Sequence, residues 1–262
     1  MKKLAIFFSL IFLCMVAFYF LVLKPEKYEE VDLYSEIMQR GVIKVGINTD
    51  AKPFAYYDND KLIGYDVDLA RYIAQYILKN SDKVEFVSVT PSNRMLKVST
   101  GEADIIIAAM TITPQRKEII DFSIPYDSAG QALLVKSSST ITSMGDLAGE
   151  NVGIIWGTTA EKNMLNLAPT ANIIGFKTYK DAYLALKAGK INAITSDDAI
   201  LNRFVLDDSE VKLLSKRYSR EPYGIGMKKG KSTAKLREVL NEAIKDMQQK
   251  NVINRLHKTW LG

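Results

Sequence analysis

Polar side chains follow four apolar, strand-like segments of this chain, and each polar cluster begins a segment with helical periodicity. The clusters supply Asn48, Asp50, Thr111, Thr113, Thr158, Thr159, Asp197 and Asp198. In open α/β sheets, ligands bind beyond the carboxyl ends of the strands, where helix N-termini present free N–H groups. Hydroxyl and carboxylate groups, together with the nearby guanidinium of Arg116, are therefore expected where a small polar ligand would bind.

These residue types favour binding over covalent chemistry. The clusters contain no nucleophile beside a base, no group of metal ligands and no glycine-rich phosphate loop. The only histidine, His257, lies near the C-terminus and away from every cluster, so we expect it to be solvated or packed. We therefore expect no catalytic residue, no metal and no cofactor.

Composition and charge narrow the class of protein further. The chain has 262 residues, 47% of them hydrophobic, which is enough for a sizeable core in one or two domains. The net charge is +5, but lysine and arginine alternate with acidic residues along the chain. Nucleic-acid binding needs basic residues clustered on one face, so no nucleic-acid partner is expected.

The N-terminus resembles an export signal. Lys2 and Lys3 precede the uncharged apolar run 4–23, which is the layout of a secretory signal. The run is long enough to span a bilayer, and no Ala-x-Ala-like cleavage site follows it. We interpret residues 1–24 as an export signal that is retained as a membrane anchor, with the rest of the chain outside the cytoplasm. Cys14 lacks the small preceding residues of a lipidation site, so we expect a free thiol there.

Strand and helix patterns alternate after a polar, partly helical linker at 25–41. Strands are expected at 42–48, 84–89, 104–110, 131–136, 152–156, 173–176, 193–195, 212–215 and 223–227, and helices at 66–78, 92–99, 113–119, 160–167, 179–188, 198–206, 232–250 and 252–260. Such alternation is typical of parallel sheets with helices on their faces. We expect two lobes, the first formed by 42–131 and 226–262 and the second by 132–225.

The segment Gly64–Leu69, Gly-Tyr-Asp-Val-Asp-Leu, resembles the signature of family 3 bacterial extracellular solute-binding proteins, the amino-acid receptors of ABC importers. Further matches follow in order over 40–262: Asp50-x-x-Pro53-Phe54, Gly101-x-x-Asp104, Met110-Thr111-Ile112-Thr113-Pro114-x-Arg116, Asp121-Phe122-Ser123-x-Pro125-Tyr126, Gly157-Thr158-Thr159, Asp197-Asp198, Pro222-Tyr223-Gly224 and Trp260. The resemblance implies a two-lobed type II periplasmic-binding fold, α/β, with two mixed, mostly parallel sheets. It also implies a two-strand hinge at 131–136 and 219–226, a monomer, and a membrane permease as partner.

The resemblance also assigns roles to residues around the ligand. The expected binding set is Asn48, Phe54, Arg94, Ala109, Thr111, Arg116, Thr158, Thr159 and Asp197. Arg116 would hold the α-carboxylate with two parallel bonds, helped by Thr111 and the backbone N–H of Thr159. Thr158 and Thr159 open a helix, whose dipole attracts an anion, although both residues could simply cap it. Asp197 would bind the α-ammonium, with helix capping as the alternative.

The identity of the ligand side chain depends mainly on Arg94. Family members that take acidic amino acids often carry an arginine at this place, and a buried arginine without a carboxylate is costly. We therefore expect glutamate or aspartate, with glutamine or another polar amino acid as the alternative. Arg94 could instead be exposed or paired with Asp50. Asn48 is compatible with either ligand, and any aromatic lid would come from Phe54 or from elsewhere.

Two other functions compete with that of an import receptor. Some relatives are exported dehydratases of cyclohexadienyl acids, but this chemistry needs a general acid in the cleft, and Asp50 is the only candidate. A sensory role would require a separate membrane partner. Asp66 and Asp68 are expected to cap the helix that follows Gly64 rather than to bind ligand.

Overall fold

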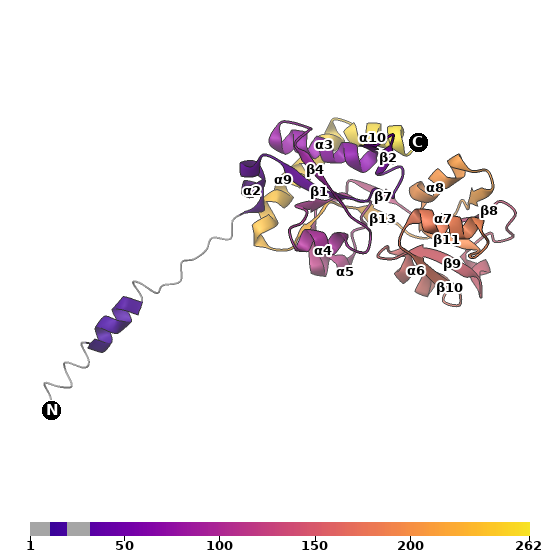
Figure 1. Ribbon diagram of the computed structural model, residues 1–262, viewed down its shortest axis with the longest axis horizontal. Helices are drawn as coiled ribbons and strands as arrows, with labels where there is room; N and C mark the ends of the chain where they lie inside the picture. The colour runs from indigo at the N-terminus through magenta and orange to yellow at the C-terminus, as the bar shows by residue number, and fades with distance from the viewer. Residues whose placement is uncertain (1–10, 20–31) are drawn as a thin grey trace, which may run out of the picture. The chain divides into compact units, whose positions relative to one another are not determined.

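The computed structural model describes residues 11–19 and 32–262 (Figure 1), which belong to two separate units. Residues 11–19 are helical, and Cys14 is exposed there. The remainder of the predicted anchor lies outside the described residues. Within the described ranges, no helix is both long enough and apolar enough to cross a membrane.

The first lobe is built on a five-stranded sheet in the order β4-β1-β5-β14-β6. β1 (Ile43–Ile47) lies between β4 (Val84–Ser88) and β5 (Ile105–Ile106), and both pairs are parallel. β14 (Gly226–Lys228) returns late in the chain and pairs antiparallel with β5 and with β6 (Ile120–Phe122). The predicted parallel arrangement therefore holds for β1, β4 and β5, whereas β14 runs antiparallel to its neighbours.

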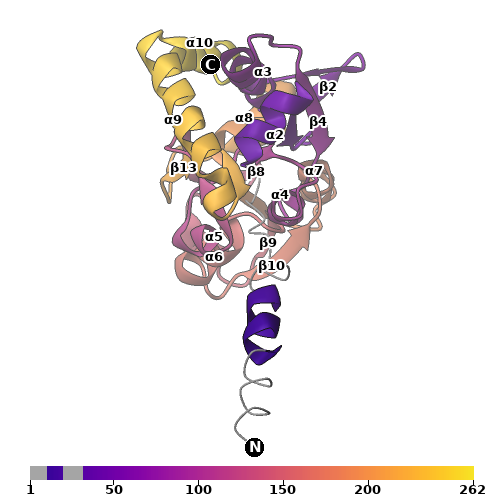
Figure 2. The same ribbon diagram turned by 90° about the vertical axis from the view of Figure 1, so that its left-hand side faces the viewer.

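Among the described residues, six α-helices, the short 3-10 helix η2 (Lys231–Thr233) and a hairpin complete this lobe. The α-helices come from both the N-terminal and the C-terminal parts of the folded unit. They are α2 (Leu33–Arg40), α3 (Tyr65–Leu78), α4 (Arg94–Ser99), α5 (Pro114–Ile119), α9 (Ala234–Gln249) and α10 (Val252–Trp260), with the hairpin β2 (Tyr56–Asp58) and β3 (Lys61–Ile63). α9 packs on α2 and α3 (Figures 1 and 2). Ile37 of α2 is completely buried in the main core, so the predicted linker at 25–41 is wrong for the part from Asp32 onward.

The second lobe contains another five-stranded sheet, in the order β10-β9-β11-β8-β12. Its strands are β8 (Gln131–Lys136), β9 (Asn151–Ile155), β10 (Asn172–Phe176), β11 (Ala193–Asp197) and β12 (Val211–Leu213). β9, β10 and β11 are parallel, whereas β8 is antiparallel to β11 and β12. The helices of this lobe are η1 (Met144–Leu147), α6 (Ala160–Leu167), α7 (Tyr179–Lys187) and α8 (Asp198–Asp207).

Two short strands connect the lobes. β7 (Asp127–Ala129) pairs antiparallel with β13 (Glu221–Tyr223), and both run between the lobes (Figure 1). The prediction of a hinge at 131–136 is therefore wrong, because Gln131–Val135 are buried inside the second sheet as β8. The second crossing, β13, lies within the predicted hinge segment 219–226. The two-lobed type II fold with a two-strand hinge is confirmed.

Backbone geometry shortens one predicted strand next to the binding motifs. The strand expected over 104–110 is only Ile105–Ile106, and Ala109 adopts a left-handed conformation with φ 44°. A residue with a Cβ rarely adopts this conformation. The chain therefore turns out of the sheet at Ala109, just before Thr111.

Candidate ligand-binding site

A narrow cavity between the lobes gathers all predicted binding residues except Phe54. The members of the set that line it are Asn48, Arg94, Ala109, Thr111, Arg116, Thr158, Thr159 and Asp197. Other lining residues, which the sequence did not single out, are Ala51, Pro91, Ala108, Tyr179 and Ile200. The cavity volume is about 10 Å³, close to the minimum for one water molecule.

Arg116 forms a buried positive group on one wall. Thr113 caps α5, because its hydroxyl oxygen accepts the Arg116 N–H at 3.2 Å, and this fixes the start of the short helix. Arg116 Nη1 donates to the Thr111 carbonyl at 2.7 Å, and Nη2 donates to the Gly157 carbonyl at 2.9 Å. Burial, and then the charge of Arg94, lower the pKa of Arg116 to about 9. The guanidinium is thus held by neutral carbonyls and can still attract an anion.

Arg94 is the second buried arginine, with 3% of its surface exposed. Its Nη1 donates to the Ala108 carbonyl at 2.7 Å and its Nη2 to the Gly157 carbonyl at 3.4 Å. Within the described residues, Nε has no hydrogen-bond partner and the group forms no ion pair. Burial lowers its pKa. An exposed Arg94, or one paired with Asp50, is therefore excluded.

Asp50 instead joins the two lobes. Its carboxylate accepts the backbone N–H of Tyr179 at 2.6 Å, at the first turn of α7. Burial raises the pKa of Asp50, while this hydrogen bond opposes the rise. A negative charge at a helix N-terminus is favourable. Asp50 thus contributes to the contact between lobes rather than to the charge balance of Arg94.

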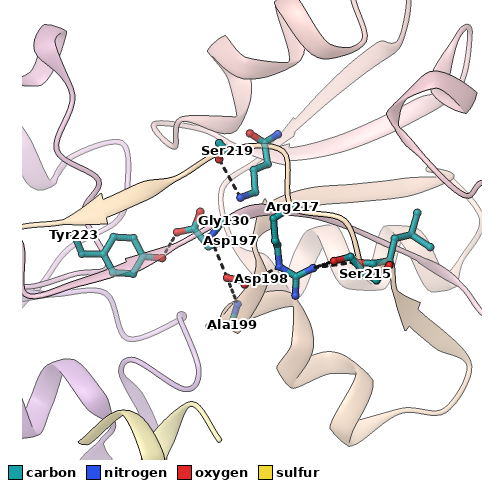
Figure 3. Close-up of polar contacts among 10 residues, drawn as sticks. Gly130, Asp197, Asp198, Ala199, Ser215, Arg217, Ser219 and Tyr223 are labelled. Carbon is teal, nitrogen blue, oxygen red and sulfur yellow. Dashed lines mark hydrogen bonds and ion pairs between the residues drawn. The ribbon is translucent and has the colours of Figure 1, made fainter. Parts of the chain in front are cut away.

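Asp197 supplies the negative group of the cavity at the end of β11. Its carboxylate accepts a hydrogen bond from the Tyr223 hydroxyl (Figure 3). Burial raises the pKa of Asp197 to about 6, although the Tyr223 bond lowers it in part. The side chain makes no capping bond to α8, so the capping alternative is wrong. Above about pH 6, Asp197 is a buried carboxylate suited to a cation.

The start of α6 closes the cavity from the second lobe. Thr158 donates its hydroxyl to the Ile155 carbonyl at 2.8 Å, and the Thr159 side chain makes no capping bond. Gly157 has φ +82°, and a Cβ added there would lie 2.5 Å from the Pro91 carbonyl oxygen. Gly157 therefore allows a close approach between lobes, and its carbonyl accepts from both arginines. In the sequence, this close approach is indicated only by the glycine that precedes Thr158 and Thr159.

Asp66, a buried residue in the first turn of α3, supports the site through the backbone of Ala109. Its carboxylate accepts the Ala109 N–H at 2.9 Å and the Tyr126 hydroxyl at 3.2 Å. Burial raises the pKa of Asp66 to about 7. The predicted capping role is wrong, since Gly64 is the N-cap and no side chain caps α3. Asp68 is also structural, because it accepts from Trp260 Nε1 at 2.8 Å.

Phe54 lies outside this cavity. It is 1% exposed, and its ring meets Tyr65 and Tyr223 edge-on at centroid distances of 5.8 and 5.6 Å. It lines a separate cavity of about 250 Å³ near the hinge. The structure therefore places Phe54 in aromatic packing and not over the arginines.

Known proteins match the chain over this whole region. The model of the bacterial extracellular solute-binding proteins, family 3, matches residues 43–262. The ABC transporter glutamine-binding protein GlnH of Bacillus subtilis is 35% identical over 241 residues, covering 91% of this chain and 88% of the relative. A glutamine-binding protein of Geobacillus stearothermophilus is 40% identical over 197 residues, covering 74% of this chain and 75% of the relative.

A solved structure agrees with both the fold and the class. An ancestral arginine-binding protein bound to glutamine has a TM-score of 0.79 and 35% identity, covering 85% of this chain and 99% of the other. Family match, relatives and fold all point to the same class of transport protein. The chain belongs to the family 3 bacterial extracellular solute-binding proteins and is a solute-binding protein of an amino-acid ABC transporter.

Proposed function

We propose that this protein binds L-glutamine, or a closely similar polar uncharged amino acid, between its lobes and delivers it to a membrane permease. The observation that carries the proposal is the pairing of Arg116 and Asp197 in one buried cavity. An α-amino acid needs an anion site and a cation site close together. Arg116 would bind the α-carboxylate through its planar guanidinium, and Asp197 would bind the α-ammonium.

The second lobe adds a further site for the carboxylate. Thr158 and Thr159 lie at the N-terminal end of α6, where backbone N–H groups and the helix dipole favour an anion. Thr111, on the first lobe, lines the same cavity and is 5% exposed. An amino acid bound here would contact both lobes, which favours the closed arrangement over an open one.

Glutamine is preferred over the acidic amino acids that the sequence favoured. Both curated relatives described above are named for glutamine, and the ancestral protein is glutamine-bound. The buried carboxyl groups of Asp66 and Asp197 offset part of the positive charge of Arg94 and Arg116, although burial raises the pKa of Asp66 to about 7. This balance is compatible with an uncharged ligand side chain. Arg94 Nε, which has no hydrogen-bond partner among the described residues, can donate to the side-chain amide oxygen of glutamine.

Access to the cavity requires the lobes to separate. A volume of about 10 Å³ is far too small for an amino acid to pass through. The contacts that must break include the Asp50–Tyr179 hydrogen bond and the exposed Lys52–Asp207 ion pair at 3.2 Å. The hydrogen bonds from Arg94 and Arg116 to the Gly157 carbonyl also cross between the lobes and must break. Periplasmic binding proteins close around their ligands by hinge motion of this kind. β7 and β13 would then act as the pivot.

We infer binding rather than turnover. A dehydratase would need a general acid facing the substrate. Asp50 is engaged by the Tyr179 N–H, and Asp197 is engaged by the Tyr223 hydroxyl. Neither carboxyl group is therefore poised to transfer a proton to a bound acid.

Location and partners follow from the proposed role. The binding unit would lie outside the cytoplasmic membrane as a monomer, with the apolar run 4–23 as its anchor. Its partner would be the permease of an amino-acid importer. Co-purification with a permease, and not with a receptor kinase, would support import over sensing.

The ligand assignment is tested by titrating the purified protein with glutamine and glutamate in a calorimeter. The two ligands differ only at the side-chain amide, and we expect glutamine to bind at least about tenfold more tightly. Arg94→Ala should weaken glutamine binding by about tenfold, since a hydrogen bond from a charged donor is lost. Arg71→Ala removes an exposed arginine of α3 and should change nothing. Tighter binding of glutamate would restore the acidic assignment, and binding of no amino acid would refute the receptor role.

Binding is also expected to depend on pH through Asp197. Its pKa of about 6 means that the carboxylate is ionised above pH 6 and neutral below it. Only the ionised form attracts the α-ammonium, so affinity should be constant from pH 7 to 8 and fall by up to about tenfold per pH unit below 6. Titrations between pH 5 and 8, with circular dichroism to confirm folding, measure this. Constant affinity across the range would exclude Asp197 as the ammonium site.

A further inference from the structure

Two adjacent aspartates at the end of β11 and the start of α8 point in different directions (Figure 3). Asp197 accepts from Tyr223 and lines the ligand cavity. Asp198 lies on the other side of the chain, next to Arg217 and Gly130. The family assignment and the binding set give Asp198 no role, so its contacts need a separate explanation.

Asp198 connects three separate segments of the hinge region. Its Oδ2 accepts from Arg217 Nε at 2.7 Å, and its Oδ1 accepts from the N–H of Gly130 at 3.2 Å and of Ala199 at 2.9 Å. Its own N–H donates back to the Gly130 carbonyl at 2.9 Å. Gly130 belongs to the first crossing between lobes, and Arg217 to the second. The carboxylate therefore joins both crossings to the start of α8.

Arg217 is itself held in place by the second crossing. Its Nη1 donates to the carbonyls of Leu214 and Ser215 at 3.0 and 3.1 Å. A Cβ on Gly130 would lie 3.0 Å from the Arg217 Cβ and 3.1 Å from the Ser219 carbonyl oxygen, so the two crossings pass very close to each other here. This geometry leaves little freedom for the Asp198 side chain.

Stability alone does not account for this arrangement. The side chains of Asp198 and Arg217 are 28% and 35% exposed, and ion pairs at that level of exposure add little to folding. The arrangement has a clear consequence for the neighbouring residue, because Asp197 and Asp198 are joined by one rigid peptide unit. A shift of the Asp198 backbone is passed through this unit to the Asp197 backbone, which carries the carboxylate that faces Tyr223 and the cavity.

We propose that Asp198, paired with Arg217, is a positioning residue for the ligand site: it fixes the start of α8 against both hinge crossings and so directs the Asp197 carboxylate toward the ligand's ammonium group. This inference rests on the proposed amino-acid function. It differs from that function in assigning part of the ammonium recognition to a side chain that does not touch the ligand.

The test compares glutamine with 4-carbamoylbutanoate, which keeps the carboxylate and the amide but lacks the α-ammonium. Asp198→Asn removes the charge that holds Arg217 while keeping the shape of the side chain. We expect it to weaken glutamine binding about tenfold and to change binding of the analogue less than about twofold. The difference is expected because Asp198 affects the ligand only through the α-ammonium group, which the analogue lacks. Asp82→Asn, which breaks the exposed pair with Arg71 in the first lobe, is the matched control and should change neither.

A ligand-free measurement separates this proposal from the proposed function. Asp198→Ala removes all three accepted bonds, so hydrogen exchange at the Gly130 and Ala199 amides should become at least about tenfold faster. Equal losses for both ligands in Asp198→Asn would show a general effect on closure and overturn the positioning role. Unchanged amide exchange in Asp198→Ala would overturn it whatever the protein binds. Faster exchange in a protein that binds no amino acid would refute the proposed function and, with it, the role in ammonium recognition, while supporting the link from Asp198 to the hinge crossings.

Discussion

Arg116→Ala is expected to weaken amino-acid binding by about 2–5 kcal/mol, or about thirtyfold to several thousandfold. Arg116 is 8% exposed, and among the described residues its guanidinium donates only to the carbonyls of Thr111 and Gly157 and forms no ion pair. A bound carboxylate would therefore supply the anionic partner that these residues do not. Without the guanidinium, that carboxylate would be buried with no cation to bind it. Calorimetric titration with glutamine measures the loss directly.

The fold should survive this substitution. Burial depresses the pKa of Arg116 to about 9, which shows that the folded protein gains little from the charge itself. We therefore expect the thermal midpoint to change little. Arg116→Lys keeps the charge but loses the two-pronged geometry, and should fall between alanine and the parent protein.

Lys117→Ala is the matched control for this experiment. It removes a positive charge from the next residue of the same short helix, where the side chain is exposed and lies outside the cavity. Unchanged affinity in both variants would show that the α-carboxylate binds elsewhere. Equal losses in both variants would point to long-range attraction by the net positive charge of α5.

The positions of residues at strand ends and helix starts could be predicted from the neighbouring sequence. Thr111, Thr158 and Asp197 were found in this way because the direction of a parallel strand determines which edge of the sheet they reach. Arg116 was singled out because it closely follows Thr111 and Thr113 and matches the family motif. The alternation of strands and helices also predicted two α/β lobes, since this pattern is a property of neighbouring residues.

Contacts between distant residues could not be predicted in the same way. The carboxylate of Asp50 binds the N–H of Tyr179, and that of Asp66 binds the N–H of Ala109, across many intervening residues. Both acids were assigned other roles from their immediate neighbours. The placement of Phe54 at the ligand could not be judged from the sequence for a similar reason. Its packing against Tyr223 depends on how the hinge strand β13 passes the first lobe.

Gly157→Ala is expected to weaken binding by at least about tenfold, through closure of the lobes and not through a lost contact. Alanine is strained at φ +82°, at a cost of about 1–3 kcal/mol. In addition, its Cβ would lie 2.5 Å from the Pro91 carbonyl oxygen of the opposite lobe, and this clash exists only when the lobes are close. Because the closed form is the one that binds, reducing its population lowers the apparent affinity in proportion.

Gly149→Ala separates backbone strain from the clash between lobes. Gly149 also has a left-handed φ, +73°, and lies in the second lobe, but nothing is within 4 Å of an added Cβ. Both variants should lose similar stability in thermal unfolding, whereas only Gly157→Ala should lose affinity and show a larger radius of gyration in X-ray scattering with saturating glutamine. If Gly157→Ala bound glutamine as tightly as Gly149→Ala, the lobes would not need the Gly157–Pro91 approach to hold the ligand. The carbonyl of Gly157 would then be no more than an acceptor for the two arginines.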